Sequence, residues 1–85
     1  MRVLIVESEV NLGWLWKNHL ERFFPTVRLA RGQSEAVALI EREAFDVIVL
    51  DLVLAEGSAF AVADYASYRT PAAKVIFVTN TTRSW

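Results

Sequence analysis

The sequence predicts an open, doubly wound parallel sheet of the α/β class. Three short runs of apolar, mostly β-branched residues each end at a polar residue, and amphipathic helical patterns separate the runs. A continuous apolar run is typical of a strand that is buried on both faces. Strands that alternate with helices of about 10–15 residues indicate right-handed crossovers and therefore a parallel sheet.

Four strands are expected in this sheet. The buried ones cover residues 3–6, 47–50 and 75–78. Residues 27–30 alternate apolar and polar side chains, which is typical of an edge strand with one face in water. We expect the strand order 2-1-3-4, so that residues 27–30 form one edge and residues 3–6 lie between the second and third strands.

Three helical patterns lie between these strands. The first stops at Pro25, the second covers residues 34–43 with Ser34 as the expected N-cap, and the third begins after Ser58 and runs to about residue 68. The residues expected to face the sheet are Leu12, Trp16, Leu20, Phe23 and Phe24 in the first helix, Ala36, Leu39 and Ile40 in the second, and Phe60, Ala63 and Ala66 in the third.

Composition limits the range of functions. The 85 residues allow one domain at most, and we expect residues 1–85 to form it. The net charge is -1 and no block of Lys or Arg occurs, so direct nucleic-acid binding is not expected. The chain has no cysteine, which excludes disulfides and thiolate metal sites. The apolar run near Met1 is too short for a signal peptide or a membrane span, so we expect a cytoplasmic protein without a membrane partner.

The last predicted strand lacks a neighbour in the sequence. Residues 75–78 have the apolar character of a central strand, yet only a short polar stretch follows them. An exposed apolar strand edge is normally covered, because its unpaired backbone favours aggregation. We therefore expect a domain that is incomplete at its C-terminus. The missing neighbour would be a further βα unit or a strand from another chain, and the segment alone should be a homo-oligomer.

Polar residues follow the three buried strands at their carboxyl ends. These residues are Glu7, Asp51 and Thr79. Ligands of open parallel sheets bind outside the carboxyl ends of the strands, so the three side chains should converge. Two neighbouring carboxylates repel each other unless a cation lies between them, and oxygen ligands of this kind suit Mg²⁺. The alternative, that a polar residue at a strand end simply begins a loop, stays open for each position taken singly.

Three segments carry a family resemblance. Residues 3–9 (VLIVESE), residues 46–52 (DVIVLDL) with Gly57 shortly after them, and residues 71–79 (PAAKVIFVT) occur in this order and spacing. Together they resemble the receiver domain of bacterial response regulators in two-component signalling, whose fold is flavodoxin-like. The resemblance covers the whole chain.

The resemblance implies a phosphorylated signalling switch and not an enzyme. Asp51 would accept a phosphoryl group from a phosphohistidine of a sensor histidine kinase or a histidine phosphotransfer protein, giving an aspartyl phosphate. Thr79 would be the switch residue. The metal ligands would be Glu7, Ser8, Asp51 and Val53, and the metal would be Mg²⁺.

Several positions depart from the family pattern. Ser8 stands where the family has a second acid, and a hydroxyl is a poorer ligand than a carboxylate, so weak Mg²⁺ binding is expected. Ala55 stands where proline is common, and Asn80 stands where a small residue is usual. No residue matches the lysine or the aromatic residue that the family carries on a fifth strand.

Two other functions stay open. A degenerate receiver that takes no phosphate could act as a protein-interaction or dimerisation module, which the serine and the unmatched lysine favour. An unrelated enzyme on a doubly wound sheet is disfavoured, because dinucleotide binding needs a glycine-rich turn after the first strand and residues 7–13 do not supply one.

Some conspicuous residues have simpler interpretations. His19 is expected at the surface, and Trp14 is a candidate contact residue. Tyr65 and Tyr68 are expected to pack, and Gly13 inside a helix indicates a close approach of neighbouring groups.

Overall fold

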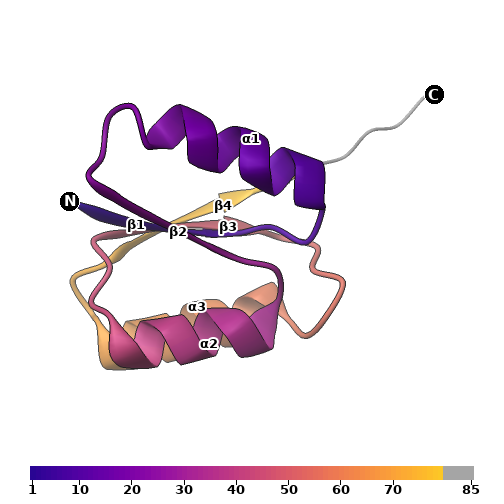
Figure 1. The fold of residues 1–85 in the computed structure, drawn as a ribbon. Helices are drawn as coiled ribbons and strands as arrows, with labels where there is room; N and C mark the ends of the chain where they lie inside the picture. Colours follow the sequence, from indigo (N-terminus) through magenta and orange to yellow (C-terminus); the bar gives the residue numbers. More distant parts are fainter. Residues whose placement is uncertain (80–85) are drawn as a thin grey trace.

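The computed structural model describes residues 1–79 as strands and helices in strict alternation (Figure 1). Each strand contains the run that the sequence predicts and is longer by one residue. The elements are β1 (Arg2–Val6), α1 (Val10–Leu20), β2 (Thr26–Ala30), α2 (Gln33–Arg42), β3 (Val47–Asp51), α3 (Ala59–Arg69) and β4 (Lys74–Val78).

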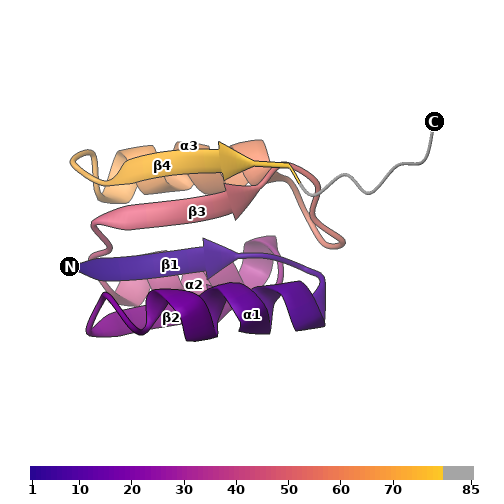
Figure 2. The same ribbon diagram turned by 90° about the horizontal axis from the view of Figure 1, so that it is seen from above.

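The strands form one parallel sheet in the order β2-β1-β3-β4, which confirms the predicted order. Val3 of β1 lies between Val27 of β2 and Val47 of β3. Helix α1 covers one face of the sheet, and α2 and α3 cover the other (Figure 1). The arrowheads of β1, β3 and β4 point to the same side, so the carboxyl ends of these strands share one edge (Figure 2).

Two apolar clusters hold the layers together. Strands β1 and β3 contribute to both clusters, which explains why their sequences are apolar without alternation. The larger cluster, on the side of α2 and α3, contains Leu4, Val6, Ala30, Ala36, Ile40, Phe45, Ile48, Leu50, Ala59, Val62 and Ala66. The smaller cluster, on the side of α1, contains Val3, Ile5 and Val27, with Trp16, Leu20 and Phe24 among the residues packed against it.

Helix α1 begins at a carboxylate cap and lies close to the sheet. The Glu9 side chain accepts hydrogen bonds from the backbone N–H groups of Asn11 (3.3 Å) and Leu12 (2.6 Å), which satisfies donors that the first helical turn leaves open. Gly13 is buried, and a Cβ there would lie 3.1 Å from a methyl carbon of Leu29. This close approach is the reason for a glycine within the helix, as the sequence suggested.

The end of α1 differs from the prediction. The helix ends at Leu20, and a turn of five residues leads to β2. Phe23 was expected on the inward face but is 64% exposed, and its ring meets His19 edge-on. The expectation for Phe23 was wrong because helical periodicity no longer applies beyond residue 20. His19 itself is exposed, as expected.

The N-terminus of α2 also differs from the prediction. Gly32 is the N-cap, and the helix begins at Gln33, so the assignment of Ser34 as the cap was wrong. The Ser34 hydroxyl instead donates to the carboxylate of Glu56 at 3.1 Å. A side chain from another loop therefore replaces the local cap that the sequence suggested.

Helix α3 turns Ala63 and Ala66 to the larger cluster, as expected, but not Phe60. Ser58 caps it by accepting from the backbone N–H groups of Phe60 (3.2 Å) and Ala61 (3.4 Å). Phe60 was expected to point inward but is 68% exposed, and Tyr68 is exposed as well, so both expectations were wrong. Tyr65 packs against the larger cluster, as expected. The buried positions of α3 are Ala59, Val62 and Ala66.

Strand β4 is less buried than its sequence suggests. Ile76 and Phe77 are 42% and 43% exposed, and within residues 1–79 no strand pairs with the outer edge of β4. Val78 lines an apolar hollow of about 530 Å³ between β3, β4 and α1. Among the described helices, none is long and apolar enough to cross a membrane.

Candidate functional site

Three neighbouring strands bring a polar residue to the same edge of the sheet. Glu7 directly follows β1, Asp51 is the last residue of β3, and Thr79 directly follows β4. These strands are adjacent in the order β1-β3-β4 and run parallel. The three residues therefore lie at the carboxyl edge, where open α/β sheets bind their ligands.

Glu7 and Asp51 form a buried pair of carboxyl groups. Their exposed fractions are 2% and 4%, and they are the buried charged residues of the described chain. One oxygen of Glu7 accepts from the backbone N–H of Glu9 at 3.0 Å, and one oxygen of Asp51 accepts from the backbone N–H of Val53 at 3.0 Å. The other Glu7 oxygen, Oε1, is buried and has no hydrogen-bond donor. Such a group is costly unless a proton or a cation satisfies it.

The electrostatics of the pair follow from this geometry. Burial raises the pKa of the Glu7 carboxyl to about 7. The hydrogen bond from the Glu9 N–H opposes this rise in the pKa, whereas the neighbouring Asp51 carboxylate, which favours a protonated Glu7, adds to it. Near neutral pH, Glu7 is therefore poised between holding a proton and giving it up to a cation.

The pair fits a hard divalent cation. Mg²⁺ is usually held by one or two carboxylates, with water or phosphate oxygens in the remaining positions. The unsatisfied Glu7 oxygen beside Asp51 supplies an oxygen of this type. Within residues 1–79, no group of three or more His, Cys, Asp or Glu side chains gathers as a richer metal site.

Ser8 points its hydroxyl into a junction between loops. The hydroxyl donates to the carbonyl of Arg31 at 2.6 Å and accepts from the backbone N–H of Ala55 at 2.9 Å. Both contacts are with protein groups outside the Glu7–Asp51 pair. The role of Ser8 as a metal ligand stays a prediction.

Val53 and Thr79 flank Asp51 from two loops. The Val53 backbone contacts the Asp51 carboxyl group, while its side chain is 74% exposed. Asp51 lies beside Val78 in the sheet, and the N–H of Leu52 donates to the Val78 carbonyl at 2.8 Å. Thr79 therefore follows directly on the residue paired with Asp51. The expectation for Asn80 lies outside the described residues.

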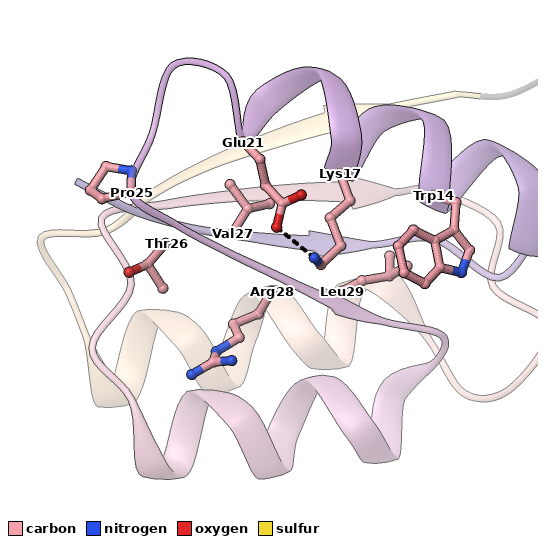
Figure 3. A pocket seen from close by; sticks show the side chains of 8 residues that line it. All are labelled: Trp14, Lys17, Glu21, Pro25, Thr26, Val27, Arg28 and Leu29. Carbon is pink, nitrogen blue, oxygen red and sulfur yellow. Dashed lines mark hydrogen bonds and ion pairs between the residues drawn. The ribbon is translucent and has the colours of Figure 1, made fainter.

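A separate groove lies between α1 and the edge strand β2 (Figure 3). Its volume is about 600 Å³. An ion pair between Lys17 and Glu21 at 2.6 Å spans its wall, and the Lys17 ammonium lies 5.4 Å from the ring centre of Trp14. Trp14 is 53% exposed, which suits the contact role expected from the sequence. None of the predicted site residues lines this groove.

Two residues near the site were missed by sequence reasoning. Gln33, at the start of α2, donates its backbone N–H to the carbonyl of Glu56 in the loop after β3. The side chains of Gln33 and Glu56 accept from the backbone N–H groups of Ser58 and Ser34, respectively. The signal that could have found them is the pair of glycines beside them, Gly32 and Gly57, because Gly57 has a φ of +79° that other residues rarely adopt.

Comparisons with known proteins point to one class of protein. No family model matches the chain. The chain is similar to the response regulator protein PilR of Pseudomonas aeruginosa, with 33% identity over 78 residues that cover 92% of this chain and 18% of PilR. It is also similar to the structure of the non-phosphorylated HemR receiver domain from Leptospira biflexa, with 33% identity and a TM-score of 0.82, covering 98% of this chain and 67% of that one.

A third similar structure bears on chemistry. It is a response regulator protein from Burkholderia pseudomallei with a phosphorylated aspartic acid, a calcium ion and citrate. Its TM-score is 0.88 at 25% identity, covering 95% of this chain and 48% of that one.

The fold and the carboxyl pair define a flavodoxin-like regulatory domain with an acidic site at the carboxyl edge of its sheet. The chain belongs to the receiver-domain family of response regulators, as the HemR comparison shows. It spans less than a fifth of the length of PilR.

Proposed function

We propose that this chain is a phosphoacceptor receiver domain of a two-component phosphorelay, with Asp51 as the acceptor. The observation that carries the proposal is the buried Glu7–Asp51 pair with its unsatisfied oxygen. Residues 1–85 are proposed to belong to one receiver-like domain. A phosphorelay of this kind acts in the cytoplasm, and a cytoplasmic location is part of the proposal.

The proposed reaction is a phosphoryl transfer from histidine to aspartate. An Asp51 carboxylate oxygen forms the new P–O bond, and the P–N bond of the phosphohistidine breaks. The imidazole leaves with the electron pair of that bond. The other oxygen of the Asp51 carboxylate would accept the hydrogen bond from the Val53 N–H, which is 3.0 Å long and holds the group in place. The donor would be a sensor histidine kinase or a histidine phosphotransfer protein.

A divalent cation is part of this proposal. Glu7, Asp51 and Val53 would hold Mg²⁺, with Ser8 as the weaker fourth contributor. The ion supplies positive charge that offsets the carboxylates and the transferring phosphoryl oxygens. The phosphorylated aspartic acid and calcium ion in the Burkholderia pseudomallei protein support a divalent ion at a site of this kind.

Thr79 is proposed as the switch residue. It follows the residue that pairs with Asp51, so a phosphoryl group on Asp51 would lie at the end of the strand that Thr79 extends. A hydroxyl at this position can donate to a phosphoryl oxygen and shift the balance between two loop conformations.

A degenerate receiver is the second candidate. The observation that favours it is the Ser8 hydroxyl, which is engaged by Arg31 and Ala55 and stands where the family carries an acid. In this case the domain would act as a protein-interaction module. The two candidates differ in one measurable property, which is whether Asp51 takes up phosphate.

We further propose that this segment forms a homo-oligomer through the edge of β4. The β2 edge carries Arg28 within the strand, a charge that discourages edge pairing, whereas β4 carries a charge only at Lys74, its first residue. Phe60 and Phe77 pack at 6.0 Å beside this edge and are both exposed. A second copy in antiparallel pairing would cover these rings and place the two Lys74 side chains at opposite ends.

The experiment that tests the phosphoacceptor proposal is covalent labelling of Asp51 by a small phosphodonor in the presence of Mg²⁺. Uptake of one phosphate that Asp51→Asn abolishes would support the first candidate. A folded protein that stays unlabelled would support the second.

A further inference from the structure

Ser8 joins three loops at the carboxyl edge of the sheet. It lies in the loop after β1, donates to the Arg31 carbonyl in the loop after β2, and accepts from the Ala55 N–H in the loop after β3. The distances are 2.6 Å and 2.9 Å. Two of these loops follow Glu7 and Asp51, so the carboxyl pair sits on backbone that this hydroxyl ties together.

Glu56 caps helix α2 from the loop after β3. Its carboxylate accepts from the backbone N–H of Ser34 at 2.9 Å and from the Ser34 hydroxyl at 3.1 Å. The N-cap residue, Gly32, has no side chain for this role. The Glu56 carboxylate therefore satisfies a donor of the first turn and lies at the positive end of the helix dipole.

Gln33 reinforces the same junction from the helix side. Its N–H donates to the Glu56 carbonyl at 3.0 Å, and its side-chain oxygen accepts from the Ser58 N–H at 2.8 Å. The loop after β3 and the start of α2 are thus held by hydrogen bonds in both directions.

Two glycines make room for this junction. A Cβ on Gly32 would lie 2.6 Å from a carboxylate oxygen of Glu56 and 3.1 Å from its Cβ. A Cβ on Gly57 would lie 2.2 Å from the Cβ of Gln33. A side chain at either position would force the junction apart.

We infer that Glu56 is a positioning residue that couples the Asp51 site to the amino end of α2. We call Ser8, Gln33, Ser34 and Glu56 the interloop clamp. Glu56 lies five residues after Asp51, so the clamp fixes the far end of the short loop whose Val53 N–H holds the Asp51 carboxyl. The inference rests on the proposed function, because it concerns the same site.

The inference requires that the coupling between the cation site and the clamp be positive. A cation bound at the Glu7–Asp51 pair would stabilise the loop after β3 in the conformation in which Glu56 contacts Ser34. By linkage, the clamp strengthens cation binding by the same factor by which the cation strengthens the clamp. The Ser34 amide donates a hydrogen bond to the Glu56 carboxylate. Cation binding should therefore slow the hydrogen exchange of this amide.

The test compares two acidic residues of the same region in the full chain. Glu56→Ala removes the contacts of the clamp carboxylate with Ser34. Glu35→Gln is the matched control, because Glu35 also lies in the first turn of α2 but accepts from Arg31, at 2.9 Å, and not from the loop after β3. The readouts are the Mg²⁺ titration midpoint and the exchange rate of the Ser34 amide with and without Mg²⁺.

We expect Glu56→Ala to raise the Mg²⁺ midpoint by roughly five-fold or more and to abolish the effect of Mg²⁺ on Ser34 exchange. Glu35→Gln should keep both close to the wild type. Gly32→Ala should act like Glu56→Ala, because it displaces the same carboxylate. Glu56→Gln keeps an acceptor oxygen, so its Mg²⁺ midpoint and its Ser34 exchange should lie between those of the wild type and those of Glu56→Ala. A loss caused by misfolding alone would not be recovered in this way.

Equal Mg²⁺ midpoints in the wild type and in both folded clamp variants would overturn the inference. So would a shift of the same size in Glu35→Gln. If the wild type takes up phosphate at Asp51 while the clamp variants match it in midpoint and labelling rate, the inference fails alone. If the wild type neither binds Mg²⁺ nor takes up phosphate, the proposed function fails and the inference fails with it.

Discussion

Glu7 and Asp51 meet as two buried carboxyl groups at the ends of adjacent parallel strands, and one oxygen of Glu7 has no hydrogen-bond donor. Neither side chain can satisfy the other while both are ionised, because both are then acceptors. A proton or a cation resolves this conflict. The first two predictions follow from the competition between them.

The first prediction concerns stability and pH in the absence of divalent cations. The Glu7 carboxyl has a pKa of about 7 in the folded chain and an ordinary value of 4.5, so the folded state holds its proton more tightly than the unfolded state. Stability should therefore fall as pH rises from about 4.5 to about 7 and then level off, with a loss on the order of 3 kcal/mol at most.

Urea denaturation at several pH values measures this slope. Glu7→Gln should remove most of it, because the amide keeps the shape of the side chain without its charge. A slope that Glu7→Gln leaves intact would show that another group is responsible.

The second prediction is that Mg²⁺ and the Glu7 proton compete. Mg²⁺ should raise the free energy of unfolding at about pH 8, where Glu7 is ionised, and should have little effect at about pH 5. Thermal melts with and without Mg²⁺ at the two pH values measure this difference. Equal stabilisation at both values would place the ion somewhere other than at Glu7.

The third prediction tests Ser8 as the weak point of the metal site. Ser8→Asp adds a third carboxylate beside Glu7 and Asp51 and should lower the Mg²⁺ titration midpoint by about ten-fold. Ser8→Ala is the control, because it removes the hydrogen bonds to Arg31 and Ala55 without adding a ligand. A midpoint that Ser8→Asp leaves unchanged would remove Ser8 from the metal shell.

The fold could be predicted because strand burial leaves a direct mark on the sequence. β1 and β3 face apolar clusters on both sides, so their runs do not alternate, whereas β2 carries the exposed Arg28. Helix faces were harder, because one residue of shift turns a side chain by about 100°. Phe60 follows the buried Ala59 directly and points outward for this reason.

The site could be predicted only where strands place its residues. Glu7 follows β1 and Asp51 ends the adjacent strand β3, so strand order alone brings them together. The clamp joins Ser34, in the first turn of α2, to Glu56, in the loop after β3, and the two residues are 22 positions apart. No periodic pattern records such a contact, and only Gly32 and Gly57 hinted at the crowding there.

The fourth prediction concerns the β4 edge. If a second copy pairs with it, Ile76→Lys should convert an oligomer into a monomer, because the charge would be buried at the centre of the interface. Sedimentation over about a ten-fold range of concentration measures the assembly state. Thr26→Lys, on the β2 edge, is the matched control and should leave the oligomer intact. A wild-type chain that stays monomeric throughout would contradict the pairing.

The most direct test of the central proposal is the intact mass of the protein after incubation with a small phosphodonor and Mg²⁺. We expect one added phosphate in the wild type and in Asp64→Asn, a control on the exposed surface of α3, and none in Asp51→Asn. Hydroxylamine should release the added group, since an acyl phosphate reacts with it and a phosphate ester on Ser or Thr does not. Equal labelling of Asp51→Asn and the wild type, or no labelling of a folded wild-type chain, would contradict Asp51 as the phosphoacceptor.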